Sequence, residues 1–349
     1  MRAVPPRMYA NVNSIVPESQ IDYKSEDFQL PLGDIDDYKI VRKIGRGRYS
    51  DVYEGIKIIK SAEKEESENI SEENSEESFG EESFESSFKE DKRCVIKILK
   101  PVRQQKINRE YLILSKLTHD SIVRMIDFVK DVESNTYSLI MDYIPNVATV
   151  EAFKSMDTQD IKHYSRQLLE GLHYTHKRGI MHRDIKSINL IINQETKVLK
   201  IIDWGLAEFY YPNKDLTCKV GSRYYKAPEL LVNYKYYHYC IDIWAFGCVF
   251  AEMALKRYPF LKGSCNLNQL FLITKFFGNK NFYRFLEEYK IKIDEEIAEN
   301  ICDSKNPAYD SMCAQNLDPE IQEVLEGCFI FDITKRFTAK ELLNLKFFN

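Results

Sequence analysis

The sequence predicts an α+β protein with a small, mostly β N-terminal lobe followed by a larger, mostly α C-terminal lobe. From Asp37 onward, apolar and polar residues alternate in short runs that are typical of strands. Beyond Pro145 the apolar spacing becomes helical, and one run, CIDIWAFGCVFAEMAL, is apolar almost all round. The expected divisions are an N-terminal extension over residues 1–36, the small lobe over 37–143 and the large lobe over 144–349.

The small lobe should hold five strands and one helix. The runs YKIVRKIG and SDVYEGIKII predict two strands joined by a glycine-rich turn, and CVIKILKP predicts a third strand. Residues 104–117 place Ile107, Tyr111, Leu114 and Leu117 at helical spacing, which predicts an amphipathic helix. The runs IVRMIDFVKD and TYSLIMDYI then predict two more strands.

The large lobe should be organised by two helices. The run IKHYSRQLLEGLHYTHKRG predicts a long helix that ends at a glycine, and residues 240–255 predict a buried one. The eight cysteines form no C-x-x-C pair, which favours buried, reduced thiols over a metal site. No apolar run approaches the ~18 residues of a transmembrane helix, and no secretory signal is recognisable. The expected localisation is therefore the cytoplasm and the nucleus.

The charge of the chain is unevenly distributed. Residues 61–92 carry 13 acidic and 3 basic side chains, so this Ser/Glu tract has a net charge of −10. Because the whole chain has a net charge of −5, the remainder carries +5. The tract is expected to form a solvated, disordered insert between two strands of the small lobe. A sharper hypothesis is that it is itself phosphorylated, since Ser78 and Ser87 each have a glutamate three residues downstream.

Two features of the small lobe suggest a nucleotide-phosphate site. In GRGRYSDV (45–52), Gly45 and Gly47 would let the backbone approach phosphate oxygens, and Ser50 occupies the place of a third glycine. Lys97 lies at the centre of a strand, where a charge is costly unless it is paired. Glu110, on the amphipathic helix, is the expected partner that orients Lys97 on the α- and β-phosphates of ATP. A solvent-facing lysine is the alternative explanation.

The strongest single motif is HRDIKSIN (182–189). Its spacing predicts that Asp184 accepts or orients the proton of a substrate hydroxyl and that Asn189 binds magnesium. Lys186 would neutralise the transferring γ-phosphate, and a lysine at this position is typical of Ser/Thr protein kinases. In IIDWG (201–205), Asp203 would provide a second magnesium ligand.

Two further pairings are predicted in the large lobe. Glu229 of YKAPE is expected to pair with Arg336, and Asp242 is expected to anchor the backbone of the 182–189 loop; capping of a helix is the alternative for Asp242. The order and spacing of all these elements predict a bilobal protein kinase fold. Lys97, Asp184, Asn189 and Asp203 are all present, which favours an active enzyme over a non-catalytic scaffold on the same fold.

In its details the chain resembles the catalytic alpha subunits of casein kinase II. The similar features are the GRGRYSDV loop, Asp-Trp-Gly followed by LAEFYYP, the segment KILKPVRQQKINRE and the N-terminal PRMYANVN. The resemblance implies Ser/Thr phosphorylation in acidic contexts, ATP and Mg²⁺ as cofactors, GTP as an alternative donor, acidic protein substrates, and a beta-type regulatory subunit on the small lobe. No nucleic-acid or membrane partner is expected.

The resemblance also assigns roles to particular residues. It implies that Met8 to Asp22 pack on the activation segment, the stretch between IIDWG (201–205) and the end of YKAPE (225–229), and keep the enzyme active without phosphorylation. It implies that a carboxylate next to the target residue is read by Lys219, Arg223 and Lys226. The residues implied for purine binding are Val52, Val95, Ile191 and Ile202, with the hinge at Asp142 to Ile144.

Three alternatives remain open at this point. The N-terminal extension could be a disordered leader, and the basic residues of the 219–226 segment could bind neighbouring backbone instead of substrate. The chain could also resemble the proline-directed cyclin-dependent and mitogen-activated kinases. In the casein kinase II comparison, Gln104, Gln105 and Asn108 stand where lysines are usual, and residues 303–313 depart from the family pattern.

Overall fold

The computed structural model describes residues 1–15, 22–58, 93–145, 149–301 and 317–349. They form two compact units. The larger unit consists of Met1–Tyr23, Leu112–Val123 and Pro145–Asn349, and the smaller consists of Lys24–Tyr111 and Arg124–Ile144. The acidic tract 61–92 and the segment 303–313 lie outside the described residues, so the expectations for them stay predictions.

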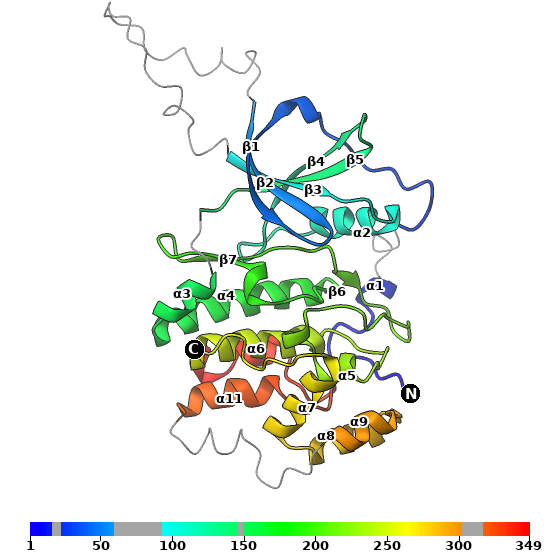
Figure 1. Cartoon of the computed structure of the whole chain (residues 1–349), viewed down its shortest axis with the longest axis vertical. Helices are drawn as coiled ribbons and strands as arrows, with labels where there is room; N and C mark the ends of the chain where they lie inside the picture. The colour runs from blue at the N-terminus through cyan, green and yellow to red at the C-terminus, as the bar shows by residue number, and fades with distance from the viewer. Residues whose placement is uncertain (16–21, 59–92, 146–148, 302–316) are drawn as a thin grey trace, which may run out of the picture. The chain divides into compact units, whose positions relative to one another are not determined.

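The smaller unit is built on one five-stranded antiparallel sheet in the order β1-β2-β3-β5-β4. Its apolar face buries Cys94, Ile96, Val129 and Ile140 against one another. Figure 1 shows these strands together with the helix that follows β3. The elements are the 3₁₀ turn Ile35–Asp37, β1 Tyr38–Arg46, β2 Ser50–Lys57, β3 Arg93–Leu99, α2 Gln104–Ser115, β4 Met125–Asp131 and β5 Thr136–Asp142.

The larger unit is mainly helical. Helices α4, α6 and α11 pack side by side in its interior, as Figure 1 shows. The helices are α1 Val12–Ile15, α3 Thr149–Ser155, α4 Thr158–Lys177, α5 Pro228–Leu231, α6 Cys240–Leu255, α7 Asn266–Phe277, α8 Lys280–Glu288, α9 Glu295–Asn300, α11 Pro319–Cys328 and α12 Ala339–Leu343. The short strands are β6 Ile180–Met181, β7 Leu190–Asn193, β8 Val198–Ile201 and β9 Glu208–Phe209, and the 3₁₀ turns are Ser187–Asn189, Arg223–Tyr225 and Lys346–Phe348.

The predicted sequence of sheet followed by helices is confirmed. The long helix α4 ends two residues before Gly179, which adopts a φ of +72° as a helix-stopping glycine does. Helix α6 is buried on every face, including its acidic residues Asp242 and Glu252. The described cysteines are free thiols, all of them buried except Cys265. Among the described residues, no helix is both long and apolar enough to cross a membrane.

Candidate active site

The lysine and glutamate predicted to pair in the smaller unit do so. Lys97 lies on β3, where it is opposite Val52 of β2 and Leu139 of β5. Its Nζ donates to Oε1 of Glu110 on α2 at 2.8 Å, and both side chains are about nine-tenths buried. A charge at the centre of a strand is compensated in this way. The alternative of a solvent-facing Lys97 is therefore excluded.

The backbone conformation and packing of the turn between β1 and β2 do not themselves require glycine at Gly45 or Gly47. A Cβ on Gly47 would lie 3.4 Å from the Ser50 carbonyl oxygen, and one on Gly45 would lie 3.5 Å from Val52, both ordinary contact distances. Neither glycine has a positive φ. The turn is closed by the Gly47 N–H, which donates to the Ser50 carbonyl at 2.8 Å. Glycine here leaves room above the backbone, as close approach of a phosphate demands.

In the larger unit, Asp184 is the centre of a polar network. Its carboxylate accepts hydrogen bonds from Lys186 Nζ at 2.7 Å and from Ser222 Oγ at 2.9 Å. Lys186 also donates to Ser222 at 2.9 Å, and Asn189 Nδ2 donates to the Asp184 carbonyl at 2.9 Å. All four side chains are buried or half-buried. The network fixes the orientation of one carboxylate; Ser222 was not predicted, because no local pattern links it to a loop nearly forty residues earlier.

The backbone of the 182–189 loop is anchored by Asp242, as predicted. Its carboxylate accepts from the N–H of His182 at 2.9 Å and of Arg183 at 2.8 Å, and it bonds to His176 Nε2 at 3.0 Å. Burial alone would raise the pKa of Asp242, but hydrogen bonds from His176 and the backbone bring it below the usual value. Arg183 itself has a φ of +67°, a strained conformation that this anchoring sustains.

The predicted magnesium ligands Asn189 and Asp203 lie on stretches of backbone that are hydrogen-bonded to each other. Asn189 ends a 3₁₀ turn, and its carbonyl accepts from the N–H of Ile202 at 2.9 Å, which places the following residue, Asp203, beside it. The Asn189 amide N–H₂ donates to Asp184, so the amide oxygen remains as a ligand for a cation. No cluster of three or more His, Cys, Asp or Glu suited to a metal occurs in the described part of the chain. One carboxylate and one amide oxygen instead suit Mg²⁺, which takes its other ligands from phosphates and water.

The residues implied for purine binding are all half-buried. Val52 and Val95 lie on β2 and β3 of the smaller unit, and Ile191 and Ile202 lie on β7 and directly after β8 of the larger unit. Ser50 is buried at the start of β2. At the end of β5, Asp142 accepts two hydrogen bonds from Arg124, at 3.0 and 2.8 Å, and Ile144 is half-buried.

The three basic residues implied for substrate recognition differ in their surroundings. Lys219 and Arg223 are exposed, although Arg223 donates to the Ser264 carbonyl at 2.5 Å. Lys226 is buried, and its ammonium donates to the carbonyls of Val220 and Cys218 in the same segment. Burial lowers the pKa of Lys226. Lys226 therefore binds neighbouring backbone, which was the alternative to substrate binding for this segment.

Arg183 has an acidic partner that sequence reasoning missed. Its guanidinium donates to the Leu206 carbonyl at 2.7 Å and lies 3.7 Å from Glu208 on β9. Glu208 also accepts from the Tyr23 hydroxyl at 2.9 Å. Arg183 and Glu208 are both buried. A carboxylate of the activation segment therefore compensates the charge of the arginine beside Asp184.

The N-terminal segment is folded against the larger unit. Asn13 is buried, and its Nδ2 donates to the carbonyls of Gly179 at 2.7 Å and Tyr210 at 2.9 Å. Arg7 makes two 2.8 Å hydrogen bonds to Glu341. The alternative of a disordered leader is wrong for residues 1–15, 22 and 23, whereas 16–21 lie outside the described residues.

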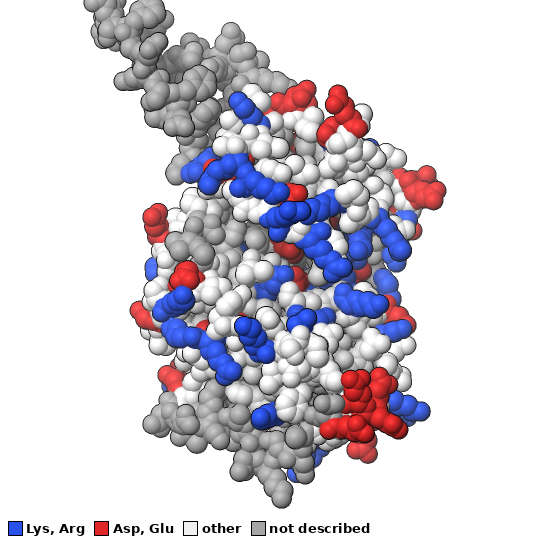
Figure 2. Space-filling model, in the orientation of Figure 1, with Lys and Arg blue, Asp and Glu red and all other residues white. Residues whose placement is uncertain are grey.

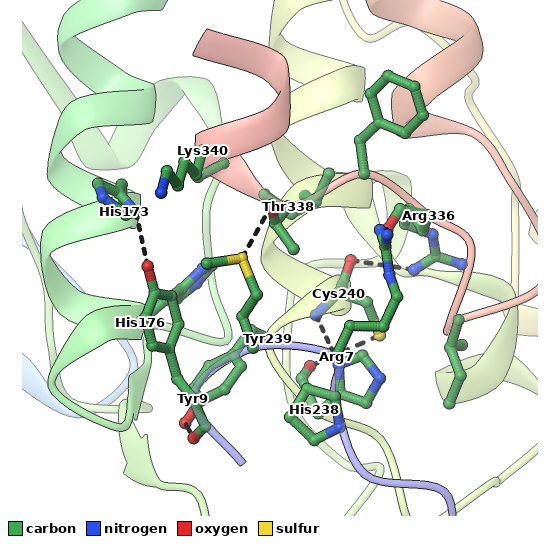
Figure 3. A pocket seen from close by; sticks show the side chains of 16 residues that line it. Arg7, Tyr9, His173, His176, His238, Tyr239, Cys240, Arg336, Thr338 and Lys340 are labelled. Carbon is green, nitrogen blue, oxygen red and sulfur yellow. Dashed lines mark hydrogen bonds between the residues drawn. The ribbon is translucent and has the colours of Figure 1, made fainter. Parts of the chain in front are cut away.

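Figure 3 shows the same segment crossing a small pocket beside α4, α6 and α12. The Tyr9 hydroxyl lies 3.4 Å from His173 Nδ1, and the Tyr9 carbonyl accepts from Tyr239 at 3.0 Å. His238 lines the pocket, and burial lowers its pKa to about 3. His238 therefore stays neutral near neutral pH.

These motifs, in this order and geometry, define a protein kinase. Residues 79–348 match the protein kinase domain family, a range that begins after β1 and β2. The chain is also 39% identical over 343 residues to a probable casein kinase II subunit alpha homolog from Encephalitozoon cuniculi, covering 97% of this chain and 95% of that relative. The chain belongs to the casein kinase II alpha family of serine/threonine protein kinases. The predicted fold and enzyme class are confirmed, and the family uses ATP and Mg²⁺.

Proposed function

We propose that this enzyme transfers the γ-phosphate of ATP to serine and threonine hydroxyls that are followed by acidic residues, and that it does so without prior phosphorylation. The observation that carries the proposal is the Asp184 network, in which Lys186, Ser222 and Asn189 fix one carboxylate. A held carboxylate of this kind can accept or orient the proton of a substrate hydroxyl.

In this mechanism each side chain has one role. Lys97, fixed by Glu110, binds the α- and β-phosphates, and the glycines of the 45–47 turn let the backbone approach the phosphates. Asn189 and Asp203 would hold Mg²⁺, which when bound neutralises charge on the β- and γ-phosphates. Lys186 lies 2.7 Å from Asp184 and is placed to compensate charge on the transferring group.

We propose that the preference for acidic substrates comes from exposed cationic side chains of the activation segment. Lys219 and Arg223 are exposed, so they can form charge-assisted hydrogen bonds with a carboxylate. The ammonium of Lys226 already bonds to two carbonyls of its own segment. We therefore propose that its main role is to stabilise the conformation of the segment, and that direct contact with substrate is its secondary role. Figure 2 shows basic side chains over the smaller unit as well, and Arg103, Lys106 and Arg109 belong to that unit.

A phosphotransfer assay on arrayed peptides tests this specificity. Peptides with Asp or Glu after the target Ser or Thr should be labelled most strongly, with GTP as well as ATP as donor. Arg223→Ala should lower kcat/KM for acidic peptides about tenfold, the effect of losing one charge-assisted contact, while neutral peptides are unaffected. Exposed Lys292→Ala is the matched control. Labelling that requires proline after the target would instead place the enzyme with the proline-directed kinases.

Constitutive activity is supported by the contacts of Arg183 and of the N-terminal segment. Arg183 already has Glu208 as its anionic partner, so no phosphate is needed to compensate its charge. Tyr23 of the N-terminal segment donates to Glu208, and Asn13 donates to the Tyr210 carbonyl. The activation segment is therefore fixed by groups that the chain itself supplies.

Replacing Asn13 by Asp should loosen this fixation. The carboxylate cannot donate to the Gly179 and Tyr210 carbonyls, and a buried group without its partners costs about 1–3 kcal/mol. We expect kcat to fall severalfold and limited proteolysis to remove the first residues faster. The matched control is the exposed Asn11→Asp, which should change neither. Equal kinetics for both variants would contradict a role of the segment in activity.

A regulatory subunit on the smaller unit is also proposed, because β1 leaves large apolar side chains in solvent. Ile40, Val41 and Ile44 are 48%, 54% and 44% exposed. We take these exposed apolar side chains on an edge strand as the candidate contact for a protein partner. Co-purification with a beta-type subunit that is lost in Val41→Asp would support this contact.

A further inference from the structure

Glu252 is a buried acid that the mechanism above does not use. It lies in the last turns of α6, is 1% exposed, and is surrounded by parts of the chain that bear on catalysis. Its Oε2 accepts hydrogen bonds from Ser187 Oγ and, at 3.2 Å, from the Tyr225 hydroxyl. Its Oε1 lies 3.4 Å from the N–H of Phe260.

The two hydroxyls come from the two loops that form the reaction site. Ser187 directly follows Lys186 and is two residues before Asn189, in the loop that carries Asp184. Tyr225 directly precedes Lys226, in the 3₁₀ turn that begins with Arg223. The Tyr225 and Ser187 oxygens are themselves 3.4 Å apart. One carboxylate thus joins the loop of the proposed base to the segment of the proposed substrate contacts.

We propose that Glu252 is a positioning residue that holds the 182–189 loop and the 223–226 segment in their catalytic arrangement, and that it does so more firmly when it is ionised. The ionised carboxylate can accept from both hydroxyls at once, and charge-assisted hydrogen bonds are the stronger ones. A protonated carboxyl is a weaker acceptor, and its hydrogen must be directed toward one of the three groups that now donate to it, Ser187, Tyr225 or the Phe260 N–H. This inference rests on the proposed roles of Asp184 and the activation segment.

The surroundings of Glu252 make its ionisation sensitive to pH near neutrality. Burial raises the pKa of Glu252 to about 7, although hydrogen bonds from Ser187, Tyr225 and Phe260 oppose the rise. The titratable groups that interact electrostatically with it are Tyr225, Tyr258 and Cys248. Burial also raises the pKa of Tyr225, which keeps its hydroxyl a donor.

Stability and activity should therefore respond to pH in opposite directions. Because the pKa of Glu252 in the folded state lies above the usual 4.5, its contribution to stability is complete below about pH 4.5 and is lost as pH rises through about 7. Over the same range the carboxylate forms and strengthens the two contacts. General damage to the fold would lower stability and activity together.

The test compares wild type with Glu252→Gln, whose amide keeps one acceptor and cannot ionise. The ratio of wild-type to variant kcat for an acidic peptide should be near 1 at pH 6 and rise to about fivefold at pH 8, the factor for exchanging a neutral for a charge-assisted hydrogen bond. The wild-type melting temperature should fall between pH 6 and 8 relative to that of the variant. The exposed Glu151→Gln is the control and should leave both profiles unchanged.

Two further variants keep the result interpretable. Ser187→Ala should also flatten the pH dependence of kcat, and adding Glu252→Gln to it should have a smaller effect than in the wild type, because the link from Glu252 to the 182–189 loop is already broken. A constant ratio of wild type to Glu252→Gln across pH would overturn the proposal. If Asp184→Asn remained active, the proposed function itself would fail; if Asp184→Asn is inactive and the ratio is constant, only the role of Glu252 fails.

Discussion

Replacing Asp184 by Asn should lower kcat for peptide phosphorylation by about two to four orders of magnitude, the usual range for loss of a general base. The amide is almost isosteric, but it cannot accept a proton and presents an N–H₂ group to one of its present donors. In the wild type, Lys186 and Ser222 both donate to this carboxylate, and the pattern requires a negative acceptor. The measurement is steady-state phosphotransfer to an acidic peptide, with kcat and KM determined separately.

The pattern of the loss distinguishes chemistry from folding. KM for ATP should change little, and the melting temperature should stay close to that of the wild type, because the loop backbone is held by Asp242 and not by Asp184. The exposed Asp120→Asn serves as the control and should retain full activity. An Asp184→Asn enzyme within tenfold of wild-type kcat would remove this residue from the reaction.

The largest effect on stability is expected at the buried pair of Glu229 and Arg336. Both side chains are 0% exposed, and two hydrogen bonds of 2.6 and 3.0 Å join them. The guanidinium also donates to the carbonyls of Ile330 and Cys240, and it lies 5.0 Å from the centre of the Trp244 ring. Arg336 thus connects the end of the activation segment to the start of α6 and to the residues after α11.

Removing one partner of this pair leaves an uncompensated charge in the interior. We expect Arg336→Met to lower the free energy of unfolding by about 3–5 kcal/mol, the usual cost of breaking a buried ion pair. Denaturant titration followed by tryptophan fluorescence measures this, since Trp244 adjoins the pair.

The control for this prediction is an exposed pair of the same kind. Lys154 and Glu151 are joined at 2.8 Å with side chains 68% and 59% exposed, and Lys154→Met should cost no more than about 1 kcal/mol. Comparable midpoints for Arg336→Met and Lys154→Met would contradict the importance assigned to burial. Because the Arg336 side chain also packs on Trp244, Glu229→Gln provides an independent measure of the lost charge compensation.

Local patterns in the sequence determined the elements and the motif residues. Alternation predicted β1 to β5, helical spacing predicted α2 and α4, and the all-round apolar run predicted the buried α6. Motif spacing was enough to pair Lys97 with Glu110 and Glu229 with Arg336. These predictions succeed because a charge in an apolar run needs a partner, and the motif specifies where that partner lies in the chain.

Other contacts depend on how segments far apart in the chain pack together. No local pattern indicates that Asn13 meets the carbonyls of Gly179 and Tyr210, or that Glu208 compensates Arg183. Lys226 has the residue type expected of a substrate contact, yet the fold of its own segment directs it to backbone carbonyls.

Glu252 illustrates the difference between what the sequence predicts and what only packing determines. An acid in a helix that is apolar on every face must find a hydrogen-bonding partner, so burial of Glu252 in α6 requires one. Which groups satisfy it depends on how two loops, 65 and 27 residues distant along the chain, close over the helix. Periodicity and motif spacing carry no information on such distances, because only packing brings the hydroxyls of Ser187 and Tyr225 to one carboxylate.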